Sequence, residues 1–219
     1  MTLKPPEHDL AQMRSDYQAA ALHREDLDPD PIRQFALWFD QACRADLPEP
    51  NAISLATVSA AGQPSLRTVL LKSYDSRGFV FFTNYQSRKS REIAENPKVA
   101  LLFTWLALAR QVSITGVAER ISTAESLRYF LTRPRGSQMA AWISNQSNVI
   151  SSRSMLDMQL EQMKQKFADG HVPLPSFWGG YLVHPHTIEF WQGRPNRLHD
   201  RFVYIRRSVD TWTIDRLAP

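Results

Sequence analysis

The stretch RPNRLHDRF, which begins at Arg194, concentrates three arginines, a histidine and an aspartate within nine residues. Side chains two positions apart lie on the same face of an extended chain. An extended conformation therefore predicts that Arg197, His199 and Arg201 lie side by side. The guanidinium groups of such a row can bind anions, and the imidazole can act as a general base or as a hydrogen-bond donor.

A second basic pair, Arg88 and Lys89, falls in the first turn of a predicted helix, after the possible cap Ser87. Positive charges at a helix N-terminus oppose the helix dipole and cost about 0.3–1 kcal/mol. An anion bound at this end would remove the penalty, because free backbone N–H groups also point toward it. The alternative is a pair of solvated basic side chains, and the residues alone leave both interpretations open.

The segment RTVLLK, from Arg67 to Lys72, has the apolar middle of a buried strand. Its two charged ends are five residues apart, so an ideal strand places them on opposite faces. A buried charge is costly unless it is paired. We therefore expect either that the two side chains bind different groups or that both lie at strand ends and reach water.

The segment YFLTRPRGS could form a phosphate site. Tyr129 and Arg133 are four residues apart and would share one helix face, and Ser137 follows the break at Pro134. A phenol, a guanidinium and a hydroxyl that converge can bind a phosphate. An ordinary amphipathic helix end has the same pattern, and without further context it is the more common explanation.

The polar residues Gln111, Gln146 and Ser147 could bind the edge of a planar heterocycle, and Trp191 could cover its ring. The alternative is that the polar residues lie on the surface and the tryptophan lies in the core. No histidine spacing such as HExxH predicts a metal site. Neither a GxSxG nucleophile motif nor a GxGxxG or GxxxxGK loop is present. The sequence thus favours a site for phosphorylated small molecules, without a metal or a protein nucleophile.

Changes in hydrophobic periodicity predict the elements that position these residues. Strands are predicted over 51–60, 65–75, 78–84, 98–107, 109–120, 178–185, 186–193, 201–207 and 211–217. Helices are predicted over 8–22, 32–43, 87–97, 125–133, 137–144 and 151–170. Ser122 and Glu125 form a capping-box pattern before the helix at 125–133. Many strands with turn-like links, and helices bunched between and around them, predict an antiparallel barrel of the α+β class.

The composition is that of a folded protein with one sizeable core. The chain has 219 residues, of which 43% are hydrophobic and 22% charged. Its single cysteine excludes an internal disulfide, no apolar run approaches the ~20 residues of a membrane helix, and the N-terminus lacks the apolar core of a signal peptide. We therefore expect a cytoplasmic protein. The net charge of +4 comes from scattered basic residues, which favours small anionic ligands over nucleic acid.

Seven short motifs occur in an order that is typical of one family: RTVLLK, TNYQSRK, RQV, RPRGSQ, PLPSFWGGY, IEFWQG and RLHDRF. With the terminal DRLAP, the similarity extends over residues 13–219, and PLPSFWGG and RLHDRF are the most specific motifs. In these features the chain resembles the pyridoxamine 5′-phosphate oxidase family. The resemblance implies a mainly β fold of the α+β class, namely an FMN-binding split β-barrel of antiparallel, Greek-key type with flanking helices. It also implies a mobile N-terminal segment at residues 1–20 that closes over the substrate, and a single barrel domain at residues 21–219.

The resemblance further implies a homodimer that holds FMN at the subunit interface. The expected reaction is the oxidation of pyridoxamine 5′-phosphate and pyridoxine 5′-phosphate to pyridoxal 5′-phosphate. Dioxygen is the expected electron acceptor and yields hydrogen peroxide, and the amine substrate also yields ammonia. No nucleic acid, membrane or metal is expected as a partner.

Matching the motifs residue by residue gives two expected sets, which overlap at Lys72. The expected FMN-binding residues are Arg67, Thr68, Val69, Leu70, Leu71, Lys72, Phe82, Thr83, Arg88, Lys89, Gln111, Gln146, Ser147, Trp191 and Arg201. The expected substrate-binding residues are Arg14, Tyr17, Lys72, Tyr129, Arg133, Ser137, Arg197 and His199. Arg197 and His199 are also the expected catalytic residues.

The sequence leaves two alternative functions open. One is another flavin reductase or oxidase on the same barrel, which would share the flavin-binding motifs but need not carry the substrate-binding set. The other is a non-catalytic protein that carries FMN or binds nucleic acid through its basic residues.

Overall fold

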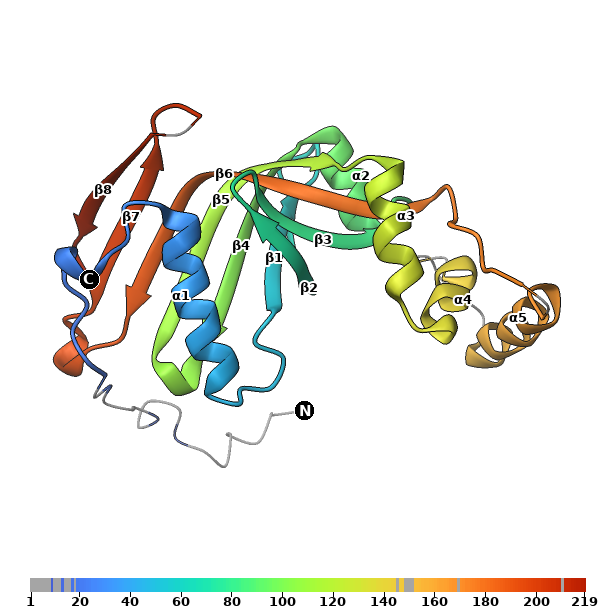
Figure 1. The fold of residues 1–219 in the computed structure, drawn as a ribbon, viewed down its shortest axis with the longest axis horizontal. Coiled ribbons are helices and arrows are strands. Elements are labelled where there is room, and N and C mark those ends of the chain that lie inside the picture. The colour runs from blue at the N-terminus through green and yellow to red at the C-terminus, as the bar shows by residue number, and fades with distance from the viewer. Residues whose placement is uncertain are drawn as a thin grey trace, which may run out of the picture.

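The computed structural model describes residues 9, 13, 17, 19–144, 146–147, 152–168, 170–209 and 211–219. Eight strands form one antiparallel sheet in the order β3-β2-β1-β4-β5-β6-β7-β8. Their bounds are β1 Ala52–Val58, β2 Pro64–Asp75, β3 Gly78–Asn84, β4 Lys98–Trp105, β5 Arg110–Arg120, β6 Trp178–Gln192, β7 Asp200–Arg206 and β8 Trp212–Leu217. A further pairing of β3 with β6 closes the first six strands of this order into a barrel, and β7 and β8 extend the sheet beyond it (Figure 1).

The barrel contains a Greek key. Strands β1, β2 and β3 follow one another as antiparallel neighbours, and β4 returns to pair with β1. The resulting spatial order β4-β1-β2-β3 defines the motif. The predicted antiparallel barrel with flanking helices is thus confirmed.

Strand β6 differs from the sequence prediction, because the two strands expected over 178–185 and 186–193 form one strand of 15 residues. Pro185 lies opposite Gly116, where the register between β5 and β6 shifts. A proline has no backbone N–H, so it is accommodated where a bulge interrupts the ladder. The shift therefore lets β6 run from the barrel to the β7–β8 extension without a break.

Five α-helices in the described part of the chain confirm predicted ones: α1 Pro31–Arg44, α2 Arg88–Glu95, α3 Thr123–Thr132, α4 Arg135–Ile143 and α5 Arg153–Lys166. The capping box before α3 is present, because Ser122 Oγ accepts from the Glu125 N–H and the Glu125 carboxylate accepts from the Ser122 N–H, both at 3.1 Å. The helix predicted over 8–22 lies mostly outside the described residues, and residues 19–22 have no regular secondary structure. No helix in the described residues is long and apolar enough to cross a membrane.

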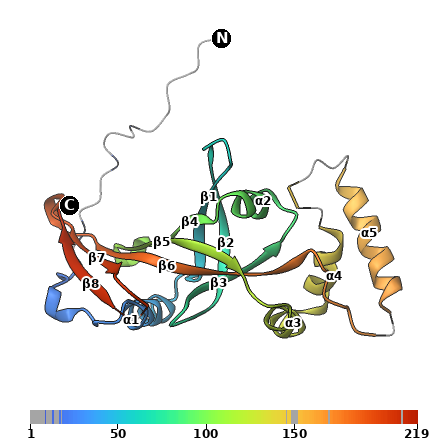
Figure 2. The same ribbon diagram turned by 90° about the horizontal axis from the view of Figure 1, so that it is seen from above.

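The core divides into two clusters, one inside the barrel and one between the barrel and the helices α3 to α5. The larger one fills the barrel interior and extends to α1, whose Phe35 is fully buried against Phe79 and Phe103. The smaller one contains Phe130 and Trp178 and supports α3, α4 and α5. Seen from above, β7 and β8 lie at one end of the molecule and α5 at the other (Figure 2). The helices α3 and α4 thus form a wall beside the barrel, and α5 packs on the outer side of α4.

Candidate functional site

A cavity of about 700 Å³, here called the basic cavity, is lined by residues of β2, β3 and the helices α2, α3 and α4. Thirteen of the residues expected to bind FMN or substrate line it: Arg67, Thr68, Val69, Leu70, Lys72, Phe82, Thr83, Arg88, Lys89, Tyr129, Arg133, Gln146 and Ser147. Residues that are dispersed over eighty positions of the sequence are therefore brought to one place by the barrel and its helical wall.

The N-terminus of α2 contributes two cations to the basic cavity, Arg88 and Lys89. The preceding Ser87 makes no side-chain cap, and the first turn contains no acidic residue. The backbone N–H of Arg88 donates to Oγ of Ser147 at 3.2 Å, and Ser147 has a left-handed φ of 72°. Two positive charges and a helix N-terminus at one cavity suit a bound anion.

Lys89 is buried, with 7% of its surface exposed. Its Nζ donates to Thr83 Oγ1 at 3.1 Å and to Gln146 Oε1 at 2.9 Å. No carboxylate among the described residues forms an ion pair with it. Desolvation, together with the nearby charge of Arg67, lowers the pKa of Lys89 to about 8. A buried ammonium held by neutral groups alone can gain a great deal from an anionic ligand.

The carboxylate of Glu92, which is 4% exposed, lies among these cations. Its Oε1 accepts from Nε of Arg88 at 2.8 Å. Its Oε2 accepts from the hydroxyls of Thr57 and Ser65, each at 2.5 Å, and Nη2 of Arg67 lies 3.3 Å from it. Burial raises the pKa of Glu92, but these hydrogen bonds outweigh burial and lower it to about 2. Glu92 was not predicted from the sequence, although its position four residues after Arg88 is the spacing of an ion pair on one helix face.

A β-bulge places Lys72 in the basic cavity. Strand β2 pairs with β3 in a register that shifts between Leu71 and Ser73, and Lys72 is the extra residue. Bulges re-aim side chains, so Lys72 and Arg67 line one cavity although an ideal strand would place them on opposite faces. Leu71, which is 5% exposed, packs in the barrel core and does not line the cavity.

Arg133 is the C-cap of α3, where Pro134 ends the helix. Its guanidinium lies 4.7 Å from the centre of the Trp178 ring. Its Nη1 is buried and has no hydrogen-bond partner in the described part of the chain, and desolvation lowers its pKa. A buried donor without an acceptor is costly. An anionic group bound in the cavity would satisfy it.

Aromatic rings form one wall of the basic cavity. Tyr129 stacks on Phe82 at 4.0 Å between ring centres, and Phe82 stacks on Trp178 at 5.3 Å. Trp178 had no role assigned from the sequence, although it belongs to the motif PLPSFWGGY. Ser137 lies in the first turn of α4 and does not line the cavity.

A second group of expected site residues, here called the C-terminal cluster, comprises Tyr17, Gln111, Trp191, His199 and Arg201. Gln111 pairs with Trp191 and Trp191 pairs with Arg201, so these three lie in one row across β5, β6 and β7. The Trp191 ring lies 4.6 Å from the His199 ring and 5.8 Å from the Tyr17 ring. The row is stabilised at its end, because Arg201 Nε donates to a carboxylate oxygen of Glu189 at 2.7 Å.

His199 has a defined orientation, because its Nδ1 accepts a hydrogen bond from the backbone N–H of Arg194 at 3.1 Å. A neutral imidazole in this arrangement carries its proton on Nε2. His199 therefore presents a donor on the side of the ring away from the backbone of Arg194.

Arg197 does not continue the row, so the predicted alignment of Arg197, His199 and Arg201 on one face is wrong. Residues Pro195–Arg197 form a short 3₁₀ turn in which Asn196 and Arg197 have φ values of 55° and 61°. The chain becomes a strand only at Asp200, where β7 begins. Arg197 is exposed and makes no hydrogen bond or ion pair with the described residues.

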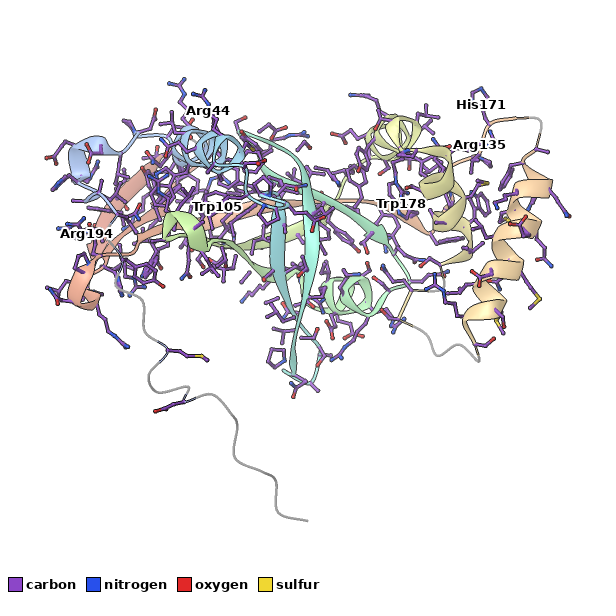
Figure 3. The ribbon with its side chains drawn as sticks, turned by 90° about the horizontal axis from the view of Figure 1, so that it is seen from below. Arg44, Trp105, Arg135, His171, Trp178 and Arg194 are labelled. Atoms are coloured by element: carbon purple, nitrogen blue, oxygen red, sulfur yellow. The ribbon has the colours of Figure 1, made fainter. Side chains whose placement is uncertain are left out.

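The basic cavity and the C-terminal cluster do not meet within one chain. No member of the cluster lines the basic cavity, and neither does Arg197. Trp178 of the cavity and Arg194, which binds His199, lie toward opposite ends of the molecule in Figure 3. Arg14 lies outside the described residues. Within the described ranges, no group of three or more histidine, cysteine or acidic side chains could hold a metal ion.

Two family models match the chain. The one described as pyridoxamine 5′-phosphate oxidase matches residues 39–167, and the one described as the pyridoxine 5′-phosphate oxidase C-terminal dimerisation region matches residues 178–219. The pyridoxine/pyridoxamine 5′-phosphate oxidase of Rippkaea orientalis is 62% identical over 211 residues, covering 96% of this chain and all of that protein. That of Crocosphaera subtropica is also 62% identical, over 213 residues, with the same coverage.

Solved structures support the same grouping. PhzG from Burkholderia lata, in complex with tetrahydrophenazine-1-carboxylic acid, superposes with a TM-score of 0.86 at 29% identity, covering 93% of this chain and all of that one. An FMN-binding protein from Nostoc punctiforme, described as pyridoxamine 5′-phosphate oxidase-related, has a TM-score of 0.69 at 15% identity, covering 88% of this chain and all of that one. The latter similarity concerns the fold alone.

Proposed function

The chain belongs to the pyridoxamine 5′-phosphate oxidase family, and on this premise we propose that it oxidises pyridoxamine 5′-phosphate and pyridoxine 5′-phosphate to pyridoxal 5′-phosphate with bound FMN. Dioxygen takes the electrons and leaves as hydrogen peroxide, and the amine substrate also releases ammonia. The observation that carries the proposal is one cavity containing two buried or half-buried cations, Lys89 and Arg133, that have no carboxylate partner among the described residues. Such a cavity suits two phosphorylated ligands, a cofactor and a substrate.

The family match indicates a flavin cofactor, and the start of α2 fits the phosphate of FMN. Arg88, Lys89 and Ser147 would hold this phosphate, because they combine two cations and a hydroxyl with a helix N-terminus that Ser87 does not cap. The β2 segment from Arg67 to Lys72 would lie along the flavin. Gln146, which already accepts from Lys89, would contribute a polar contact.

The other side of the basic cavity would hold the substrate phosphate. Arg133 has a buried N–H donor without an acceptor, and Lys72 is exposed on the bulge of β2. Tyr129 lies on the same wall and can donate a hydrogen bond through its hydroxyl. Charge-assisted hydrogen bonds of this kind contribute roughly 1.5–3 kcal/mol each. Ser137 stays a prediction, since it does not line the cavity in the single chain.

We further propose that each active site forms between two copies of the chain. The C-terminal cluster lacks a ligand cavity shared with Lys72 and Arg133, and the C-terminal match is to a dimerisation region, which indicates a homodimer. Leu66 at the rim of the basic cavity is 70% exposed, and Leu198 beside His199 is 69% exposed. Association would cover such apolar side chains. The basic cavity of one copy would then face the C-terminal cluster of the other.

FMN, when bound, supplies the two-electron acceptor for the substrate carbon. The residues of the chain bind, orient and exclude water. Gln111, Trp191 and Arg201 would contact the flavin. Arg197, exposed and without a hydrogen bond or ion pair to the described residues, would orient the substrate ring and stabilise charge that develops during transfer. His199 would donate from Nε2 to a polar group of the substrate.

The N-terminal segment at residues 1–20 would act as a lid that includes Arg14 and Tyr17. The contacts of Tyr17 support this role. Its ring packs so closely on Gly193 that a Cβ there would lie 2.7 Å from it, and it also lies edge-on to Trp191 and His199. A closed segment in this place would exclude water from the cluster.

An absorption spectrum tests the proposal. The purified protein is expected to be yellow, to bleach when pyridoxine 5′-phosphate is added without oxygen, and to regain its colour with peroxide release when oxygen returns. If pyridoxine 5′-phosphate and pyridoxamine 5′-phosphate leave the flavin oxidised and another electron donor reduces it, the result would favour a different flavin enzyme of this fold. A colourless protein that binds RNA with a steep salt dependence would favour the non-catalytic alternative.

A further inference from the structure

We propose that Glu92 is a positioning residue that holds Arg88 in place for the phosphate of FMN. This inference rests on the proposed function, because it takes the start of α2 as the flavin phosphate site. An acidic side chain inside an anion-binding site would ordinarily weaken it. The contacts of Glu92 indicate the opposite effect here.

The two oxygens of Glu92 bind different partners. Oε2 accepts from Thr57 of β1 and Ser65 of β2, each at 2.5 Å. These contacts fix the carboxylate to the barrel. Oε1 is thereby directed to Nε of Arg88 at 2.8 Å, so that α2 and its first-turn arginine are anchored to two strands at once.

The contact between Glu92 and Arg88 leaves the two terminal nitrogens of the guanidinium, Nη1 and Nη2, free to bind a ligand. An arginine has five N–H donors, and Glu92 engages only the one on Nε. Neither Nη1 nor Nη2 of Arg88 has a hydrogen-bond partner within the described part of the chain. This terminal pair is the part of the group that binds a phosphate through two parallel hydrogen bonds. Glu92 thus orients Arg88 without occupying those donors.

Arg67 is held differently and serves the scaffold. Its Nη1 donates to the Leu55 carbonyl at 3.0 Å and to Thr57 Oγ1 at 2.6 Å. Its Nη2 donates to Ser65 Oγ and lies 3.3 Å from the Glu92 carboxylate. Both terminal nitrogens are therefore occupied. Arg88 is the arginine of this network that remains available to a ligand.

The alternative is that Glu92 acts only through its charge, by competing with the phosphate for the cations. Two substitutions separate the possibilities. Glu92→Gln removes the charge and replaces one acceptor oxygen by an NH2 group. This group would face either Arg88 Nε or the two hydroxyls together with Arg67 Nη2, all of which now donate to the carboxylate, so one set of contacts is weakened. Glu92→Asp keeps the charge but is shorter by one methylene, so it cannot span both sets of partners. Positioning requires both variants to lose affinity, whereas charge competition requires Glu92→Gln to gain affinity and Glu92→Asp to match the wild type.

The experiment titrates flavin-free full-length protein with FMN and, separately, with riboflavin, which lacks the phosphate, and follows flavin fluorescence. Both Glu92 variants are expected to lose roughly 10- to 100-fold in FMN affinity, the range of one charge-assisted hydrogen bond. Riboflavin affinity should stay within about threefold of the wild type, because riboflavin makes no phosphate contact. Glu95→Gln is the matched control, since Glu95 is an exposed acid one turn further along α2 and should leave both affinities unchanged.

A double-mutant cycle tests whether Glu92 acts through Arg88. In an Arg88→Ala background, Glu92→Gln should cost little further FMN affinity, since the group that it positions is gone. If the Glu92 variants fail to fold, Arg88→Lys provides the second test. Lysine keeps the charge but lacks a separate Nε donor, so it should lose FMN affinity and leave riboflavin binding unchanged.

The outcomes also separate this inference from the proposed function. If the wild type binds FMN no more tightly than riboflavin, the flavin phosphate site itself is wrong. If the wild type prefers FMN and either Glu92 variant retains that preference, only the positioning role is overturned. Equal losses for FMN and riboflavin in the Glu92 variants would likewise overturn it, because they would show a general disturbance of the cavity.

Discussion

The charged residues of the basic cavity differ in whether other side chains compensate their charge. Lys89 and Arg133 are desolvated and held by neutral or aromatic groups, whereas Glu92 has partners for both of its oxygens. The protein therefore contains cations whose charge is not compensated by the described residues, at the places where two phosphates are proposed. Desolvation lowers the pKa of both cations, and the pKa of about 8 for Lys89 makes the site sensitive to pH.

Lys89 gives FMN binding a pH dependence. Below its pKa of about 8 the ammonium is present to bind the flavin phosphate, which is a dianion above about pH 6. Above pH 8 binding must take up a proton, so we expect FMN affinity to fall by up to about tenfold per pH unit. Lys89→Met should bind more weakly at pH 7 and show no break near pH 8. A wild-type affinity that is constant from pH 7 to 9.5 would contradict this assignment.

The same group affects stability in the opposite direction. Folding lowers the pKa of Lys89 from 10.5 to about 8. Between these two pH values the unfolded chain therefore binds more protons than the flavin-free folded protein. Stability of the flavin-free protein should therefore gain from this group as the pH rises through that window.

Arg133 should affect the substrate and leave the flavin unaffected. Arg133→Ala removes the buried donor proposed for the substrate phosphate, so we expect a loss of roughly 10- to 100-fold in kcat/KM for pyridoxine 5′-phosphate, mostly through KM. FMN affinity should stay unchanged. Arg128→Ala, on an exposed position of α3, is the control. Loss of FMN together with turnover would show that Arg133 belongs to the flavin phosphate site.

At the scale of elements, the hydrophobic periodicity of the sequence predicted nearly all strands and helices, because apolar residues recur along most of them at the spacing of a strand or a helix. The exceptions are local interruptions. The bulge at Lys72 is invisible to a period of two, since it adds one residue without a distinct residue type. Pro185 is a distinct residue, but a proline fits the end of a strand as well as a bulge within one, so two strands were predicted where β6 is continuous. The turn at Asn196 and Arg197 breaks the expected row because left-handed backbone conformations replace the extended ones.

The cations of the basic cavity could be predicted from motifs as candidate site residues, but their grouping could not. Short motifs identified the cations that the barrel later brings together in the basic cavity. Glu92 was missed because a single acid four residues after an arginine is common on solvated helices. Its role depends on Thr57 and Ser65, which reach it from two strands distant in sequence.

The contact of β6 with α3 depends on glycine. A Cβ at Gly179 would lie 2.2 Å from the Tyr85 hydroxyl and 2.9 Å from Ser126 Oγ. Gly179→Ala should therefore lower the free energy of unfolding by about 1–3 kcal/mol in a denaturant titration. Gly136→Ala is the matched control, because Gly136 has open space and lies in α4, where alanine is the better helix former, so it should be neutral or stabilising. Equal effects at the two sites would refute the packing argument.

At the scale of the whole molecule, the two groups of site residues lie at different parts of one elongated sheet. The closed barrel carries the basic cavity, and the β6–β7 region beyond it carries the C-terminal cluster. Under the proposed function, one chain would therefore present two halves of a site that do not meet. A homodimer related by a two-fold axis would bring each half against its complement and create two equivalent sites.

Heterodimers of two inactivated variants test this central claim most directly. One copy carries Arg133→Ala, which disables the basic cavity, and the other carries Arg197→Leu, which should retain FMN but lose most turnover. Two different affinity tags allow the mixed dimer to be purified after co-expression. If each site combines both copies, one site of the mixed dimer is intact, and turnover at limiting substrate should reach about half of the wild-type value per dimer. Turnover no higher than the mean of the two parent homodimers would show that each site lies within a single chain and would contradict the account.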